Sequence, residues 1–190
     1  MITVKIILGS TREGRFGEKP AQWIVEKVQK REGVEAELLD LRDYPMPFYD
    51  AAISPKMLNG VYPHEAVARW AKKIDEADAF LIATPEYNHG YSAVLKNALD
   101  WTYPEWNNKP VGLVGWGSVS GARAIEQLRE VAVEFQMAPI RNSVLIPSPW
   151  LLTDKDGNFK TEPFEESADA MIEQLLWWAK ALKDARRNTA

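Results

Sequence analysis

The chain has 190 residues, 46% of them hydrophobic and 26% charged, which fits one globular domain spanning residues 1–190. The net charge is −4 and no basic stripe is interleaved with aromatic residues, which argues against nucleic acid as a partner. Cysteine is absent, which excludes disulfides, thiol nucleophiles and iron–sulfur ligation. The only histidines, His64 and His89, lack metal-ligand spacing, so we expect no metal site.

The N-terminus lacks the basic lead and long apolar run of a signal peptide. No apolar run approaches the roughly 20 residues that span a bilayer. We therefore expect a cytoplasmic protein with no membrane partner.

Short β-rich runs alternate with longer helical patterns, which is typical of βαβ units and a parallel sheet. The first strand is expected at residues 2–8, an apolar run suited to the centre of a sheet. A helix at 20–31 and a strand at 34–40 follow. A proline-rich connection then covers residues 41–60, and connections of that length usually carry function or cover an interface.

The second half of the chain continues the alternation. A helix is expected at 65–75, and then a strand at 79–84 that ends at Pro85, because proline cannot donate to a ladder. The remaining elements are expected to be helices at 92–101, 122–135 and 165–186 and strands at 110–117 and 140–146. This pattern predicts a flavodoxin-like α/β fold with three layers and a doubly wound, five-stranded parallel sheet in the order 2-1-3-4-5.

In such a sheet, ligands bind beyond the carboxyl ends of the strands where the strand order reverses, here between the first and third strands. The loop after the first strand offers the hydroxyls of Ser10 and Thr11 and the guanidiniums of Arg12 and Arg15. Its glycines let backbone amides turn inward, and the helix that follows adds a favourable dipole. The loop therefore predicts a phosphate site that needs no metal.

Two nucleotide motifs are excluded at this loop. A Walker loop needs a lysine after its second glycine, and Arg15 stands there instead. A dinucleotide fingerprint needs GxGxxG spacing, which the loop lacks. Asp40 ends the second strand, where a dinucleotide-binding protein keeps an acid for the ribose. Without the fingerprint, we interpret Asp40 as a turn or cap residue.

The loop after the third strand reads TPEYNHGY (84–91) and is polar and aromatic. Pro85 fixes φ and biases Thr84 to an extended conformation, so the following amides are expected in a fixed array. Such amides beside an aromatic ring suit a flat heterocycle. A phosphate at one loop and a planar ring at its neighbour describe FMN better than a free nucleotide. A third loop, residues 115–121, leaves the fourth strand on the same side and is placed to close the pocket.

These stretches resemble the NADPH-dependent FMN reductase family, which includes quinone, azo-dye and chromate reductases. The matching segments are GSTREGR (9–15), PEYNHGYSAVLKNALDW (85–101) and NKPVGLVGWGSVSGARAIEQLR (108–129). The resemblance implies bound FMN, NADPH or NADH as reductant, and homodimers or homotetramers with the flavin near the subunit interface. Position by position, it implies phosphate contacts from Ser10, Thr11, Arg12, Arg15, Phe16 and Gly17, and ring contacts from Pro85, Glu86, Tyr87, Asn88, Gly117 and Ser118.

The chain departs from this family at two positions. Many relatives carry Ser or Asn near position 17, where this chain has Gly17, and a smaller residue where it has Trp116. Candidate interface residues are Tyr103, Trp106 and the connection 41–60. The last helix has a broad apolar face that includes Trp177 and Trp178, expected to pack in the core and wide enough for an oligomer seam.

The expected function is an FMN-dependent NAD(P)H oxidoreductase. Hydride passes from the nicotinamide to the flavin and then to an acceptor such as a quinone, an azo compound, a metal oxyanion or free flavin. No catalytic side chain is named, because the cofactor supplies the chemistry. The alternative is a non-enzymatic flavodoxin-type electron carrier. Such carriers tend to be strongly acidic with a phosphate loop that lacks arginine, and the charge of −4 and the arginines at 12 and 15 favour the enzyme.

Overall fold

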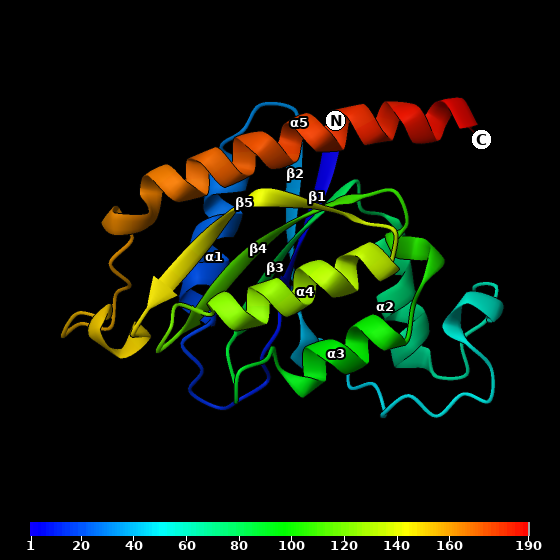
Figure 1. The fold of residues 1–190 in the computed structure, drawn as a ribbon, viewed down its shortest axis with the longest axis horizontal. Helices are drawn as coiled ribbons and strands as arrows, with labels where there is room; N and C mark the ends of the chain where they lie inside the picture. The colour runs from blue at the N-terminus through cyan, green and yellow to red at the C-terminus, as the bar shows by residue number, and fades with distance from the viewer. Residues whose placement is uncertain (190) are drawn as a thin grey trace.

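A computed structural model describes residues 1–189, and Ala190, the last residue of the expected domain, lies outside them. Its centre is a sheet of five strands that pair in parallel in the order β2-β1-β3-β4-β5 (Figure 1). The strands are β1 (Ile2–Leu8), β2 (Val34–Asp40), β3 (Ala79–Pro85), β4 (Pro110–Gly117) and β5 (Ala138–Pro147). The predicted strand order is confirmed.

Helices cover both faces of the sheet, so the predicted three layers are also confirmed (Figure 1). One face carries α1 (Glu18–Gln29) and α5 (Glu165–Thr189), and the other carries α2 (Glu65–Asp75), α3 (Ala93–Asp100) and α4 (Ala122–Glu134). Short 3-10 turns occupy Leu41–Asp43, Pro55–Met57, Pro104–Trp106, Pro149–Leu151 and Glu162–Phe164. Each face has its own apolar cluster, so the core has two halves separated by the sheet.

Several element ends differ from the sequence prediction. Strand β3 continues through Pro85, because the Glu86 amide donates to the Trp116 carbonyl (2.9 Å) and extends the pairing beyond the proline. Helix α1 begins before Pro20, which the first turn of a helix tolerates because amides there have no intrahelical acceptor.

Two tryptophans differ from the sequence prediction. Trp106, expected at an interface, is fully buried among the residues packed under α2 and α4, and its Nε1 donates to Thr102 Oγ1 (2.8 Å). Trp177 is 65% exposed on α5, so the expected core packing is wrong for it, and the oligomer seam stays a prediction. The apolar face of α5 is therefore wider than the part that the sheet covers.

The proline-rich connection after β2 is held against α3. The Tyr49 amide donates to Asn97 Oδ1 (3.0 Å), and both Asn97 Nδ2 and Trp101 Nε1 donate to the Pro47 carbonyl (2.8 Å each). Exposed apolar side chains of this segment are Phe48, Ile53, Met57 and Val61.

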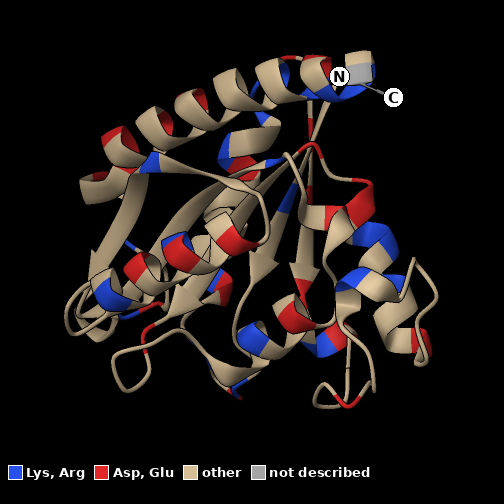
Figure 2. Cartoon of the chain, turned by 45° about the vertical axis from the view of Figure 1, so that its right-hand side comes forward, with Lys and Arg blue, Asp and Glu red and all other residues tan. Residues whose placement is uncertain are grey.

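Charges of both signs are interspersed over the helices, whereas the strands carry few (Figure 2). Across residues 1–189, no helix has both the length and the apolar character that crossing a bilayer requires.

Lys109 precedes β4 and is buried, with Nζ donating to the carbonyls of Ile74 (3.0 Å) and Asp75 (2.9 Å) at the end of α2. Burial lowers the pKa of Lys109 to about 8. Above that pH, Lys109 keeps its proton in the unfolded chain but loses it in the folded chain. The contribution of Lys109 to the free energy of unfolding therefore rises with pH. We expect urea denaturation to show the stability of the wild type relative to Lys109→Met rising from about pH 8 to about pH 9.5. A constant difference over that range contradicts the assignment.

Candidate functional site

The loops that follow β1, β3, β4 and β5 lie at the carboxyl edge of the sheet (Figure 1). Residues of these loops line a pocket of about 280 Å³. The pocket is lined by Ser10, Arg12, Arg15, Phe16, Pro85, Glu86, Tyr87, Trp116, Gly117, Ser118, Pro149 and Trp150. The structure thus brings together residues from both loops flanking the reversal of strand order. Of the predicted site residues, Thr11, Gly17 and Asn88 are not part of this lining.

The loop between β1 and α1 presents a run of backbone amides. Within residues 1–189, the N–H groups of residues 11–16 have no protein acceptor, and Gly17, the N-cap of α1, provides no side-chain cap. Unpaired loop amides form a site for an anion, and the positive end of the dipole of the helix that follows favours one there. The loop of residues 11–16, just before α1, therefore fits a phosphate group.

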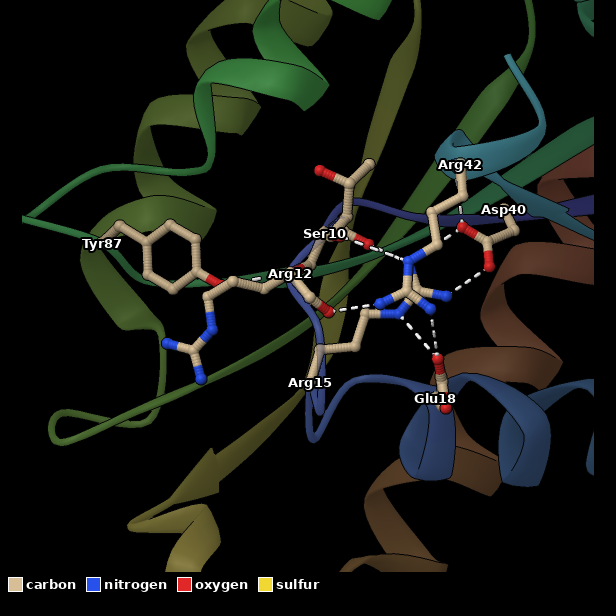
Figure 3. Close-up of polar contacts among 8 residues, drawn as sticks. Ser10, Arg12, Arg15, Glu18, Asp40, Arg42 and Tyr87 are labelled. Carbon is tan, nitrogen blue, oxygen red and sulfur yellow. Dashed lines mark hydrogen bonds and ion pairs between the residues drawn. The ribbon is translucent and has the colours of Figure 1, made fainter. Parts of the chain in front are cut away.

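The two arginines of this loop point in different directions (Figure 3). Arg12 extends toward Tyr87, with its Cζ 5.9 Å from the ring centroid, and has no acidic partner in the described part of the chain. Arg15 turns the other way, and its buried guanidinium forms ion pairs with Asp40 and Glu18. Burial opposes the charge on Arg15, but these hydrogen bonds outweigh it and raise the pKa. Arg12 is thus the loop arginine available to a ligand.

Asp40 is confirmed as a cap. Its Oδ1 accepts from the Arg42 amide (3.0 Å) at the start of the 3-10 turn that follows β2, and its carboxylate also pairs with Arg15. Burial works against ionisation of Asp40, but hydrogen bonds from Arg15 and from the Arg42 amide outweigh it and lower its pKa. The carboxylate is therefore charged at neutral pH.

The loop after β3 forms a tight turn. Tyr87 and Gly90 exchange two backbone hydrogen bonds (2.8 and 3.0 Å), with Asn88 (φ 49°) and His89 (φ 73°) between them. Two successive positive φ angles are a hairpin-turn geometry that asparagine tolerates well. Asn88 thus lies at the tip of the turn. The amides of Glu86 and Tyr87 bond to protein carbonyls, so they do not belong to an open array of donors.

Tyr87 connects the two loops. Its hydroxyl lies 3.2 Å from Ser10 Oγ, and the residue lines the pocket and is 37% exposed. An aromatic side chain therefore stands beside the loop that carries the unpaired amides.

Glu86 contributes its backbone to the pocket while its carboxylate is used elsewhere. That carboxylate is 4% exposed, accepts from the Arg123 amide (3.1 Å) at the start of α4 and forms an ion pair with the Arg123 guanidinium. Arg123 Nη1 also lies 2.9 Å from His89 Nε2. These contacts fix the turn 87–90 against α4.

The segment after β5 also contributes to the pocket, which the sequence did not predict. Pro149 and Trp150 line the pocket, and Trp150 is 64% exposed. Their one sequence signal is that they follow a strand ending at the same edge of the sheet. Trp116, noted only as a bulky substitution, lies against Gly17 and makes an edge contact with Phe16 (centroids 6.2 Å apart).

Comparisons with known proteins agree with this geometry. Residues 2–150 match the model of the NADPH-dependent FMN reductase family. An NAD(P)H-dependent FMN reductase of Schizosaccharomyces pombe is 37% identical over 146 residues, covering 76% of this chain and 73% of that protein. An NAD(P)H:quinone oxidoreductase of Solanum tuberosum is 31% identical over 171 residues, covering 82% and 85%.

Among solved structures, the flavoenzyme NAD(P)H:(acceptor) oxidoreductase FerB from Paracoccus denitrificans superposes with a TM-score of 0.75 at 26% identity, covering 95% of this chain and 98% of that one. The family match spans the sheet and every residue that lines the pocket. The chain belongs to the NADPH-dependent FMN reductase family.

Proposed function

We propose that this chain is an FMN-dependent NAD(P)H oxidoreductase that reduces a small electrophilic acceptor. The observation that carries the proposal is the loop just before α1. Within residues 1–189 its amides 11–16 have no protein acceptor, and Arg12, which lies over the Tyr87 ring, has no acidic partner. An anion-binding end next to an aromatic wall matches the two halves of FMN, and membership in the family supports the same cofactor.

In this proposal the protein binds and orients the cofactor. The amides of residues 11–16 and Arg12 hold the phosphate, and Pro85, Tyr87 and Gly117 border the ring. When bound, FMN supplies the hydride chemistry between the nicotinamide and the acceptor. The Glu86 carboxylate is paired with Arg123, which supports a structural role for it over a role as acid or base. We assign no catalytic side chain.

The acceptor class follows from the relatives, whose names include a quinone oxidoreductase and an oxidoreductase of unspecified acceptor. We propose quinones first, with azo compounds, metal oxyanions and free flavin as further candidates. A flavodoxin-type electron carrier is the alternative function. The purified protein should show a flavin spectrum that NADPH or NADH bleaches within seconds without oxygen, whereas a flavin that stays oxidised supports the carrier.

We propose further that the chain is a single cytoplasmic domain that forms a homodimer or homotetramer. The absence of cysteine fits a reducing compartment. The exposed apolar residues Phe48, Met57 and Val61 on the connection after β2 supply a surface for a second copy. Light scattering coupled to gel filtration tests the assembly, and a monomeric mass at micromolar concentration contradicts it.

Arg12→Met is expected to raise the Kd for FMN roughly 10- to 100-fold, because a charge-assisted hydrogen bond to phosphate contributes about 1.5–3 kcal/mol. Fluorescence titration of the apoprotein with FMN measures the change. The matched control is Arg141→Met, on the exposed side of β5, which should leave the Kd unchanged. Equal Kd values for Arg12→Met and the wild type contradict the phosphate assignment.

A further inference from the structure

Four consecutive carbonyl oxygens, those of residues 9–12, each accept a hydrogen bond from a side chain outside this stretch. Ser92 donates to Gly9, Arg15 to Ser10, and Arg42 to the next two carbonyls. In a trans peptide unit the carbonyl and the following amide point in opposite directions. The donors from Arg15 and Arg42 hold the carbonyls of residues 10–12 and therefore turn the amides of residues 11–13 away from these two arginines.

The two arginines that hold these carbonyls are themselves held by acids (Figure 3). Asp40 Oδ1 accepts from Arg15 Nη1 (2.9 Å) and from the Arg42 amide (3.0 Å), and Oδ2 pairs with Arg15 Nη2. Glu18 Oε1 accepts from Arg15 Nε (3.0 Å) and Arg42 Nη1 (3.1 Å). The side chain of Arg15 is 3% exposed, and that of Arg42 is 38% exposed.

We infer that Asp40, Arg15 and Arg42 are positioning residues for the phosphate loop: they fix its carbonyls outward and leave its amides for the FMN phosphate. This inference rests on the proposed function. It gives Arg15 a role different from the direct phosphate contact that the family resemblance implies. The geometry favours positioning, because the Nε, Nη1 and Nη2 groups of Arg15 all donate to protein oxygens.

Neutralising Asp40 distinguishes this inference from a purely electrostatic effect, because the two predict opposite changes in FMN affinity. The Asp40 carboxylate pairs with Arg15, which belongs to the proposed phosphate loop. Coulomb's law alone therefore predicts that neutralising Asp40 removes a repulsion on the phosphate and tightens FMN binding. If Asp40 instead orients Arg15, its neutralisation frees the guanidinium, loosens the carbonyls and weakens FMN binding.

The test compares Asp40→Asn and Arg42→Met with the control Glu13→Gln, which removes an exposed acid of the same loop. Kd values for FMN and for riboflavin, which lacks the phosphate, are measured by fluorescence titration of the full-length apoprotein. We expect the Kd for FMN to rise about tenfold in both variants and the Kd for riboflavin to change less than about twofold. Glu13→Gln should bind FMN as tightly as the wild type or more tightly.

Asp40→Asn that binds FMN as well as the wild type overturns the inference, and so does an equal loss of FMN and riboflavin affinity, which signals general damage. Because Arg42 is partly exposed, Arg42→Met keeps the test valid if Asp40→Asn does not fold. A wild type that binds no FMN refutes the proposed function instead.

Arg15→Lys distinguishes a positioning role of Arg15 from a direct contact with the phosphate. Lysine keeps the charge but cannot form the two-pronged contact with a carboxylate. We expect Arg15→Lys to bind FMN as weakly as Arg15→Met. Retention of wild-type affinity by Arg15→Lys identifies a direct charge on the phosphate and overturns the positioning role.

Discussion

Gly121→Ala is expected to lower the free energy of unfolding by about 3 kcal/mol or more. Gly121 is the N-cap of α4 with φ of +77°, and a Cβ there stands 2.5 Å from Trp116 N and 2.7 Å from the Cα of Gly115. These are backbone atoms of β4, paired on both sides, so they cannot give way. The cost of the left-handed conformation and the cost of the overlap with backbone atoms therefore add at position 121.

The matched control is Gly33→Ala. Gly33 has a similar φ of +71°, but a Cβ there meets no atom within 4 Å. Only the cost of the left-handed conformation remains, so we expect the free energy of unfolding to fall by about 1 kcal/mol. Urea denaturation of both variants measures the difference. Equal losses contradict the steric explanation.

Gly17→Ala is expected to destabilise the chain by about 2 kcal/mol, an effect that Trp116→Leu should largely remove. A Cβ at position 17 lies 2.6 Å from Trp116 Cζ2 and 2.9 Å from Leu8 Cδ1. At Leu8 the overlap is with one atom at the end of the side chain, whereas at Trp116 it is with two atoms of a rigid ring, Cζ2 and Cη2, and the ring packs against Phe16. The Trp116 ring therefore occupies the space that a side chain at position 17 would need.

A double-mutant cycle tests this coupling. Trp116→Leu alone should cost about 3 kcal/mol through the lost ring. In that background Gly17→Ala should cost less than about 0.5 kcal/mol, a coupling of about 1.5 kcal/mol. Additive losses show that the ring and the glycine are independent.

The sheet order and both principal loops could be predicted from the sequence, because apolar runs identify buried parallel strands and strand order fixes the edge where loops meet. The directions in which individual side chains point could not be predicted. A guanidinium in a loop sequence serves a phosphate or a carboxylate equally well, and Arg15 pairs with Asp40, which is distant in the chain. A tryptophan suits an interface as well as a core, and only the packing of the folded chain shows that Trp106 is buried.

Asn88 and Trp150 illustrate two further limits. The position of Asn88 depends on a turn with two positive φ angles, which PEYNHG does not specify. Trp150 follows β5 without any recognisable motif, and it reaches the pocket because β5 ends beside β4.

The uncapped start of α1 links the cofactor to stability by mass action. A ligand that binds only the folded chain stabilises it by RT ln(1 + [L]/Kd), about 1.4 kcal/mol when its concentration is ten times Kd. A phosphate held by the amides of the loop before α1 also lies at the positive end of the helix dipole. Folding and the occupancy of the pocket are then linked equilibria, and the melting temperature of the protein depends on the concentration of free FMN.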